Sequence, residues 1–282
     1  MSFRSAEGQT PPFQYDETPG RTSRFALSPE ARVLRILHTN DLHGALTDAR
    51  EARLAGLREQ TDVYFDGGDM TGKTQVRDLD REDPVWARLE RLRCDAVALG
   101  NHEIVGMMLA RRDDLRGIRT PLVCANASGV LGALPSLSFE RAGVRIGVIG
   151  VTTPRLHPSG RPLRRLSAAF GSALDLASEA VFGRFGLSDP LTGAREEARR
   201  LRPDVDVLIL LSHLGLGGDI RLVRAVPEAD IILGAHSHHQ RPPSRLGGTA
   251  YAQTGDAAEF AGVYEWDGEE LTGELIPLGP AG

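Results

Sequence analysis

Five apolar segments of this chain each end in side chains that bind metal ions well. The segments are ILHTNDLHG, VYFDGGDMTG, VALGNHE, LILLSHLG and IILGAHSHH. Carboxylate and imidazole groups suit zinc, manganese, iron and nickel, whereas an amide oxygen is a harder and weaker ligand. These residue types therefore favour metal-assisted chemistry. The candidates, in chain order, are Asp41, His43, Asp69, Asn101, His102, His213, His236 and His238.

The number of candidates predicts two ions rather than one. Such a cluster is costly to bury without a counter-charge, which divalent cations supply. A single tetrahedral zinc needs about four ligands, and seven candidates remain when His102 is set aside. Two ions roughly 3.5–4 Å apart commonly share a carboxylate. We expect Asp69 to be that bridge because the glycines beside it let backbone and ions approach closely.

Each segment has a simpler interpretation when it is taken alone. The Asp41–His43 pair is typical of a turn, GGD of a loop, GNHE of a helix cap, and His213 of a core histidine; GAHSHH also fits a surface cluster. All five occur in order, each after an apolar strand, and this conjunction favours a shared site. The remaining histidines are interpreted as structural or surface residues: His38, His157 and His239.

The elements that must position these residues alternate between strands and helices. Because polar groups beyond the carboxyl ends of strands in an open α/β sheet converge on one crevice, this order predicts an α/β fold with the candidates at one edge. A DG turn at Asp267–Gly268 predicts a closing hairpin. Strands are expected at 32–37, 62–65, 95–99, 121–127, 144–151, 206–211, 230–235, 251–255, 261–266 and 273–278, and helices at 48–60, 83–93 and 188–202, the last capped by Ser188 or Asp189.

Composition limits the possible partners. The 282 residues carry a formal net charge of -5, so no general attraction to nucleic acid or anionic membranes is expected. No apolar run approaches the length of a transmembrane helix, and the N-terminus has no apolar core typical of a secretory signal. We therefore expect a cytoplasmic protein, with Cys94 and Cys124 as buried free thiols.

The simplest partition of the chain is one domain with a tail. Residues 1–31 are rich in Pro, Gly, Ser, Thr and charge and predict a disordered or loosely packed segment. Residues 32–282 predict a single domain with a basic loop insertion around 154–187. That insertion is either a small lid over the site or a solvated surface loop, and its arginines are Arg155, Arg161, Arg164 and Arg165.

The motifs DLHG, GGD, GNHE, LSHLG and GAHSH resemble the signature blocks of the calcineurin-like metallophosphoesterases. The opening HTNDLHG, with GVTTP and AQTG, is similar to the catalytic domain of the 5'-nucleotidase and 2',3'-cyclic-nucleotide phosphodiesterase branch. The match runs from about Val33 to Ala257. The resemblance implies a four-layer α-β-β-α sandwich of two mixed sheets and two divalent ions, with manganese, zinc, iron, nickel and magnesium as candidates.

The resemblance also implies a division of roles. Hydrolysis would proceed by a metal-bound hydroxide attacking phosphorus in line with the leaving oxygen. His102, whose neighbour Asn101 is already a ligand, would stabilise charge on the phosphate or protonate the leaving group. The first ion would be held by Asp41, His43, Asp69 and His238, and the second by Asp69, Asn101, His213 and His236.

Three departures from that branch affect the prediction. Val105 stands where the branch usually has an aspartate that orients the catalytic histidine, so the residue that orients His102 is open. The loop after Asp69 reads GDMTGKTQ, in which Lys73 and Thr74 are candidate substrate contacts, together with Asn101, His102 and Arg155. Because the sequence ends at Gly282, we expect no counterpart of the branch's nucleotide-specificity domain, and this expectation puts selectivity for nucleosides in doubt.

The predicted function is hydrolysis of a small phosphomonoester or phosphodiester, with nucleotides among the candidate substrates. The native metal, the substrate and the oligomeric state are left open. One alternative is a metal- or nucleotide-binding regulatory protein with weak or no turnover, which Val105 keeps open. Another is a redox di-iron enzyme, which is less favoured because oxygen-activating sites are richer in helical glutamates.

Overall fold

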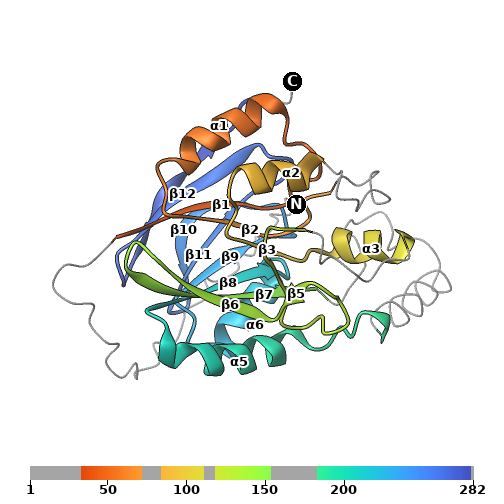
Figure 1. Cartoon of the computed structure of the whole chain (residues 1–282). Coiled ribbons are helices and arrows are strands. Elements are labelled where there is room, and N and C mark those ends of the chain that lie inside the picture. The colour runs from red at the N-terminus through yellow and green to blue at the C-terminus, as the bar shows by residue number, and fades with distance from the viewer. Residues whose placement is uncertain (1–32, 72–83, 111–117, 154–182, 281–282) are drawn as a thin grey trace, which may run out of the picture.

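Two mixed β-sheets pack face to face in the computed structural model, with helices on both outer faces (Figure 1). The structure describes residues 33–71, 84–110, 118–153 and 183–280. Apolar side chains form a core between the sheets and a further core on each outer face. The predicted four-layer α-β-β-α arrangement is therefore confirmed.

The first sheet has seven strands in the order β13-β12-β1-β2-β3-β4-β5. Strands β1 to β5 run parallel to one another, β12 is antiparallel to β1, and β13 is antiparallel to β12. The strands are β1 (Leu34–Thr39), β2 (Val63–Asp66), β3 (Ala96–Ala98), β4 (Leu122–Val123), β5 (Ala133–Leu134), β12 (Phe260–Trp266) and β13 (Leu271–Pro277).

The second sheet has six strands in the order β10-β11-β9-β8-β7-β6. Its central strands β7, β8, β9 and β11 are parallel, and the edge strands β6 and β10 are antiparallel to their neighbours. The strands are β6 (Ser136–Arg141), β7 (Val144–Thr152), β8 (Val207–His213), β9 (Ile231–Gly234), β10 (Gln240–Leu246) and β11 (Thr249–Thr254).

The helices divide between the two outer faces. Helices α1 (Asp48–Arg58), α2 (Pro84–Arg91) and α3 (Asn101–Ala110) cover the first sheet, with Trp86 of α2 buried in that core. Helices α5 (Pro190–Leu201) and α6 (Leu216–Ala225) cover the second sheet, and a 3-10 turn, η2 (Arg202–Asp204), follows α5. In Figure 1, α1 and α2 lie above the sheets, α5 and α6 lie below them, and α3 lies to the right.

Local sequence signals explain several of these boundaries. The Thr47 side chain accepts from Arg50 N at the start of α1, and Asp189, rather than Ser188, caps α5 by accepting from Thr192 N at 2.9 Å. The predicted DG turn joins β12 to β13. There, Asp267 Oδ1 accepts from the Glu269 and Glu270 amides at 2.8 and 2.7 Å.

Five described helices and strands were not predicted, namely β5, β6, β10, α3 and α6, and neither was the 3-10 turn η2. The sequence of β10, QRPPSRL, contains Pro242 and Pro243, and prolines argue against a central strand. The structure resolves this conflict because β10 lies at an edge of its sheet, where missing amide donors are tolerated.

At the amino-terminal ends of the parallel strands, an aspartate precedes the strand and accepts the backbone amide of the neighbouring strand. Three of these carboxylates also pair with arginines: Asp95 with Arg58 and Arg141, Asp206 with Arg145, and Asp230 with Arg202. The bonds to backbone N are Asp62 with Arg35 (2.8 Å), Asp95 with Tyr64 (2.9 Å), Asp206 with Arg145 (2.8 Å) and Asp230 with Leu208 (2.8 Å).

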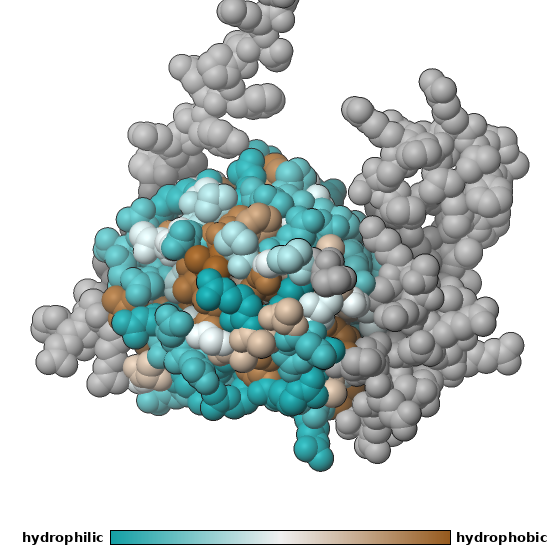
Figure 2. All heavy atoms as spheres, turned by 90° about the horizontal axis from the view of Figure 1, so that it is seen from above, coloured by the Kyte–Doolittle hydropathy of each residue, from teal (hydrophilic) through white to brown (hydrophobic). Residues whose placement is uncertain are grey.

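Cys94 and Cys124 are buried and unpaired, as expected. Among the described helices, none is long and apolar enough to cross a membrane. On the face seen from above in Figure 2, hydrophobic residues show as small areas between hydrophilic ones. The described large hydrophobic residues that are more than a third exposed are Val33, Leu131, Leu134 and Ile220.

Candidate metal centre

The sequence-predicted residues come together at the carboxyl ends of the parallel strands. Asp41 and His43 follow β1, Asp69 follows β2, and Asn101 begins α3, the helix that follows β3. From the second sheet, His213 ends β8, and His236 and His238 follow β9. The two sheets therefore each contribute ligand candidates to one place.

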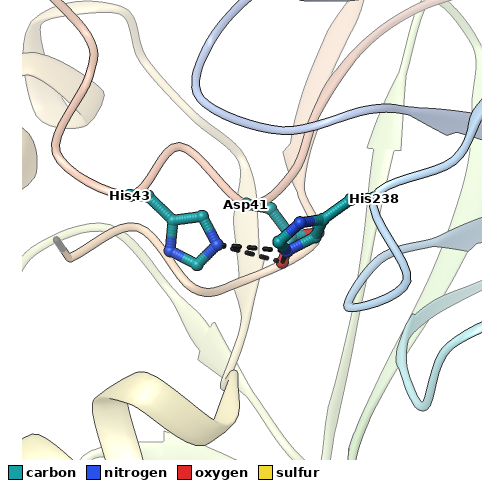
Figure 3. Close-up of side chains that lie close together, drawn as sticks. All are labelled: Asp41, His43 and His238. Atoms are coloured by element: carbon teal, nitrogen blue, oxygen red, sulfur yellow. Dashed lines mark hydrogen bonds and ion pairs between the residues drawn. The ribbon is translucent and has the colours of Figure 1, made fainter. Parts of the chain in front are cut away.

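The first group consists of Asp41, His43 and His238 (Figure 3). The His238 Nε2 atom lies 3.3 Å from Asp41 Oδ1 and 3.2 Å from His43 Nε2. Figure 3 shows the two imidazoles reaching the carboxylate from separate segments of the chain. One carboxylate oxygen and two ring nitrogens thus converge on a volume that a single cation would fill.

The second group consists of Asp69, His213 and His236. The His213 Nε2 atom lies 3.2 Å from Asp69 Oδ2, and the ring centroids of His213 and His236 are 5.1 Å apart. The other nitrogen of His213, Nδ1, lies 2.8 Å from Gly67 O. A proton on Nδ1 donated to this carbonyl leaves Nε2 available as a ligand.

His102 lies between these two groups. Its ring centroid is 4.8 Å from that of His43, and its Nε2 is 3.8 Å from Asp69 Oδ2. His43, Asp69 and His102 also satisfy the spacing of a metal-binding group, so position alone does not separate His102 from the ligand candidates. Its Nδ1 atom is buried and has no hydrogen-bond partner among the described residues.

Asn101 lies beside the bridging candidate Asp69. The next residue along the chain, His102, donates its backbone N–H to Asp69 Oδ1 at 2.8 Å. On the other side, a Cβ at Gly100 would stand 2.1 Å from the same oxygen, so the backbone passes Asp69 too closely for any side chain. The Asn101 Oδ1 atom is buried and accepts no hydrogen bond from the described residues.

Five candidates have left-handed backbone conformations, which non-glycine residues rarely adopt. Each such residue costs roughly 1–3 kcal/mol and persists only where its surroundings hold it. Concentration of this strain in the loops that carry the candidates indicates that the fold maintains a particular arrangement of side chains. The φ values are Asp41 51°, His43 48°, Asp69 56°, His236 70° and His238 55°.

Burial sets the protonation of several imidazoles. It lowers the pKa of His43 and brings the pKa of His236 to about 4, so both are neutral at pH 7, the form that binds metal. At His213, burial also acts to lower the pKa, but the Asp69 carboxylate outweighs it and raises the pKa to about 10. In the ion-free protein a proton on His213 therefore balances the charge of Asp69.

Sequence reasoning missed the buried carboxylate that shapes the Asp69 loop. The fully buried Glu103 accepts from the backbone amides of Asp69 at 2.9 Å, Met70 at 3.0 Å and Gly100 at 2.9 Å. Glu103 is thus directed to this loop rather than to His102. Glu103 belongs to the GNHE motif, but its role of accepting the amides of the Asp69 loop becomes visible only in the tertiary structure.

Asn40 is a second residue that sequence reasoning missed. Its Nδ2 donates to Asp41 Oδ2 at 2.7 Å, and its Oδ1 accepts from Thr254 N at 2.8 Å. Asp41 Oδ2 also accepts from His236 N at 2.8 Å. One oxygen of Asp41 is therefore fully engaged, whereas the other faces the imidazoles.

Several residues singled out in the sequence lie outside the described residues. They are the candidate substrate contacts Lys73, Thr74 and Arg155, the loop arginines Arg161, Arg164 and Arg165, and His157, together with the tail 1–31 and residues 154–182 of the basic insertion. Of the two remaining histidines, His38 is buried in β1, and His239 follows His238.

The donor set fits divalent cations. Asp41 Oδ1 and Asn101 Oδ1 are buried, and neither accepts a hydrogen bond from the described residues. Buried polar atoms in this state cost stability. Because Asp41 Oδ1 faces the His43 and His238 imidazoles, a cation in the first group would satisfy it, and a cation beside Asp69 would be the partner for Asn101 Oδ1.

The comparisons with known proteins agree with this geometry. The profile of the calcineurin-like phosphoesterase family matches residues 34–240. This range covers more than half of the chain and includes all of the candidates. The chain therefore belongs to the calcineurin-like phosphoesterase family.

Individual relatives are more distant. The chain is 27% identical over 241 residues to a 5'-nucleotidase of Vibrio cholerae, and 28% identical over 228 residues to the uncharacterized metallophosphoesterase YunD of Bacillus subtilis. These matches cover 72% and 73% of this chain but 40% and 44% of the relatives, so the chain spans less than half of their length.

A solved structure shares the fold. The 5'-nucleotidase precursor from Thermus thermophilus superposes with a TM-score of 0.67 at 24% identity. The superposition covers 87% of this chain and 54% of that one. At this identity the likeness establishes the architecture alone.

Proposed function

We propose that this protein hydrolyses phosphate esters at a centre of two divalent metal ions. The observation that carries the proposal is the pair of ligand groups, Asp41–His43–His238 and Asp69–His213–His236, at one end of the two sheets. The substrate class is a phosphomonoester or a small phosphodiester. Nucleotides are the first candidates because several relatives are 5'-nucleotidases.

The candidate ligands divide between the two ions. Asp41, His43 and His238 would hold the first ion, and Asn101, His213 and His236 the second, with Asp69 shared. When bound, two divalent cations supply Lewis-acid catalysis and lower the pKa of an attacking water. Glu103 keeps Asp69 in place by accepting the amides of its loop.

His102 is the candidate catalytic residue that does not hold an ion. Its ring lies 19% exposed at the edge of both groups, next to Asp69. From there it would donate a hydrogen bond to the phosphate oxygens or a proton to the leaving oxygen. Lys73 and Arg155 are proposed as further substrate contacts from their sequence positions alone.

A weak or inactive variant of the same site is a second candidate function. His102 Nδ1 has no partner among the described residues, and Val105 stands where related nucleotidases have an aspartate. An imidazole that no group orients transfers protons less efficiently. A metal- or nucleotide-binding regulator would have these features.

A metal count combined with a substrate panel distinguishes the two. The metal-stripped chain is reconstituted with Mn²⁺, its metal content is measured, and hydrolysis of aryl phosphate, bis-aryl phosphate, nucleotides, cyclic nucleotides and sugar phosphates is followed. Two ions per chain with Mn²⁺-stimulated hydrolysis are expected. Two ions without hydrolysis of any ester would favour the regulator, and failure to bind ions would refute both the two-metal hydrolase and the metal-binding regulator.

A further inference from the structure

A turn that follows β11, Gly255–Ala258, lies between the two loops that form the first group. On one side it is tied to the loop after β1. Asn40 Nδ2 donates to Gly255 O at 2.6 Å, and Ala257 N donates to Asp41 O at 2.8 Å. The turn therefore fixes the backbone of Asp41 itself.

On its other side the same turn contacts the loop after β9. Gly255 N donates to His239 O at 3.0 Å. The carboxylate of Asp256 reaches the imidazole of His238, the residue before His239. Asp256 Oδ2 lies 3.2 Å from His238 Nδ1. The turn thus joins two ligand loops that are almost 200 residues apart in sequence.

A buried arginine holds the turn in an unfavourable conformation. Arg50 is 4% exposed, and its guanidinium donates to Ala257 O at 2.6 Å and to Ala45 O at 3.0 Å. Ala257 and Ala258 have φ values of 53° and 52°, which an alanine adopts only when its surroundings impose them. The position of Asp256 is therefore built into the fold.

The two nitrogens of His238 face different partners. Nε2 points to Asp41 Oδ1 and His43 Nε2, whereas Nδ1 points to Asp256. An imidazole that binds a cation through Nε2 keeps its proton on Nδ1, and a carboxylate that accepts this proton fixes the orientation of the ring. Asp256 is placed to do this.

We propose that Asp256 is a positioning residue that orients His238 toward the first ion. The inference rests on the proposed metal function. It is separable from a general structural role, because the backbone contacts of the turn, including Glu259 N to Asp256 O at 3.1 Å, survive a change of the side chain.

The test measures the affinity of each ion rather than activity. The full chain is stripped of metal and titrated with Co²⁺, followed by calorimetry and by the visible absorption of the bound ion. Wild type is expected to bind two ions. Asp256→Ala should weaken one of them roughly 10- to 100-fold, the range typical of lost outer carboxylates, and leave the other unchanged. Asp256→Asn keeps an acceptor for Nδ1–H and should lie between.

Two further variants make the result specific. Glu259→Gln neutralises an exposed carboxylate three residues away and should bind both ions as wild type does. His238→Ala should weaken the same ion, and adding Asp256→Ala to it should cause no further loss, because the two residues act as one unit.

Each other outcome is decisive. Unchanged Co²⁺ affinity in Asp256→Ala, equal weakening of both ions, or additive losses in the double variant would overturn the inference while the proposed function stands. Wild-type chain that binds no Co²⁺ would instead refute the proposed function. Denaturant unfolding of each variant shows whether it is folded, and Asp256→Asn keeps the test available if Asp256→Ala is not.

Discussion

Aspartates at the two ends of the parallel strands differ in how they are paired. At the amino-terminal ends, Asp95 accepts the Tyr64 amide and pairs with Arg58 and Arg141. At the carboxyl ends, Asp41 Oδ1 is buried yet accepts no hydrogen bond from the described residues. A buried acceptor without a hydrogen bond is expensive, so the first end is organised for stability and the second for binding a ligand.

The backbone differs in the same way. The carboxyl-terminal loops hold Asp41, His43, Asp69, His236 and His238 at positive φ, whereas the aspartates that precede the strands are not among the described residues with positive φ. Strain collects where function requires a fixed arrangement of side chains. The comparison predicts that substitutions at the two ends have separable effects on activity and stability.

The largest effect is expected at the bridging candidate. Asp69→Asn should remove both ions and reduce hydrolysis at least about 1,000-fold, because the carboxylate serves both groups. The control is Asp66→Asn: burial raises the pKa of Asp66 to about 8, so removing its charge should matter less at pH 7 than removing that of Asp69. Metal content and rate are measured for both, and retention of two ions in Asp69→Asn would contradict the bridging role.

His102→Ala should separate catalysis from metal binding. Two ions per chain should remain, while kcat for ester hydrolysis falls roughly 100- to 1,000-fold because charge stabilisation or proton donation is lost. Metal analysis and steady-state kinetics on an aryl phosphate are the measurements. A variant with full rate on every ester, or one that has lost an ion, would show that the assigned role is wrong.

Asp95→Ala should lower the stability of the fold without affecting metal binding, in contrast to the substitutions at the metal centre. It leaves the Arg58 guanidinium, 9% exposed, without its carboxylate and the Tyr64 amide without its acceptor. The expected cost is about 3 kcal/mol in the free energy of unfolding, with metal content unchanged. Urea unfolding gives the change in stability, and metal analysis gives the metal content. Loss of metal in a folded Asp95→Ala protein would contradict the claim that the amino-terminal ends of the strands serve stability and the carboxyl ends serve metal binding.

The smallest effect is expected at His38 in β1, which makes the free energy of unfolding depend on pH in the acid range. Burial lowers the pKa of His38 to about 3, against 6.5 for the unperturbed group. Between pH 6.5 and 3 the unfolded chain binds a proton that the folded chain does not, so stability falls as pH falls. From pH 7 to 4.5 this contributes about 2–3 kcal/mol.

His38→Leu should lose this pH-dependent component, because its side chain does not titrate. The measurement is urea unfolding of both proteins at pH 7 and 4.5. Equal pH dependence in the two proteins would assign the acid sensitivity to other groups.

Much of the architecture was predictable from local signals. Apolar runs gave the central strands, and capping residues such as Asp189 gave helix starts. The edge strand β10 was not predictable, because Pro242 and Pro243 conflict with strand propensity and only its place at the sheet edge removes the conflict. Strand β6, SLSFER, alternates polar and apolar residues, with Leu137 and Phe139 on one face, and this strand signal was present in the sequence but was overlooked.

The side chains of the candidate site were predictable, but their supports were not. Metal-binding residue types following apolar strands are visible in sequence. The contact of Asp256 with His238 and that of Asn40 with Thr254 join segments that only the fold brings together. Glu103 was visible within its motif, yet its direction depends on how α3 meets the loop after β2.

The pairing of Asn40 with Thr254 and Gly255 has a consequence for the order of folding. These contacts span 214 and 215 positions, and β1 is inserted between β2 and β12, which come from opposite ends of the chain. The loop after β1, which carries Asn40 and Asp41, therefore cannot reach its final conformation until nearly the whole polypeptide has been synthesised. Ion capture should be one of the last events in maturation, following chain closure rather than guiding it.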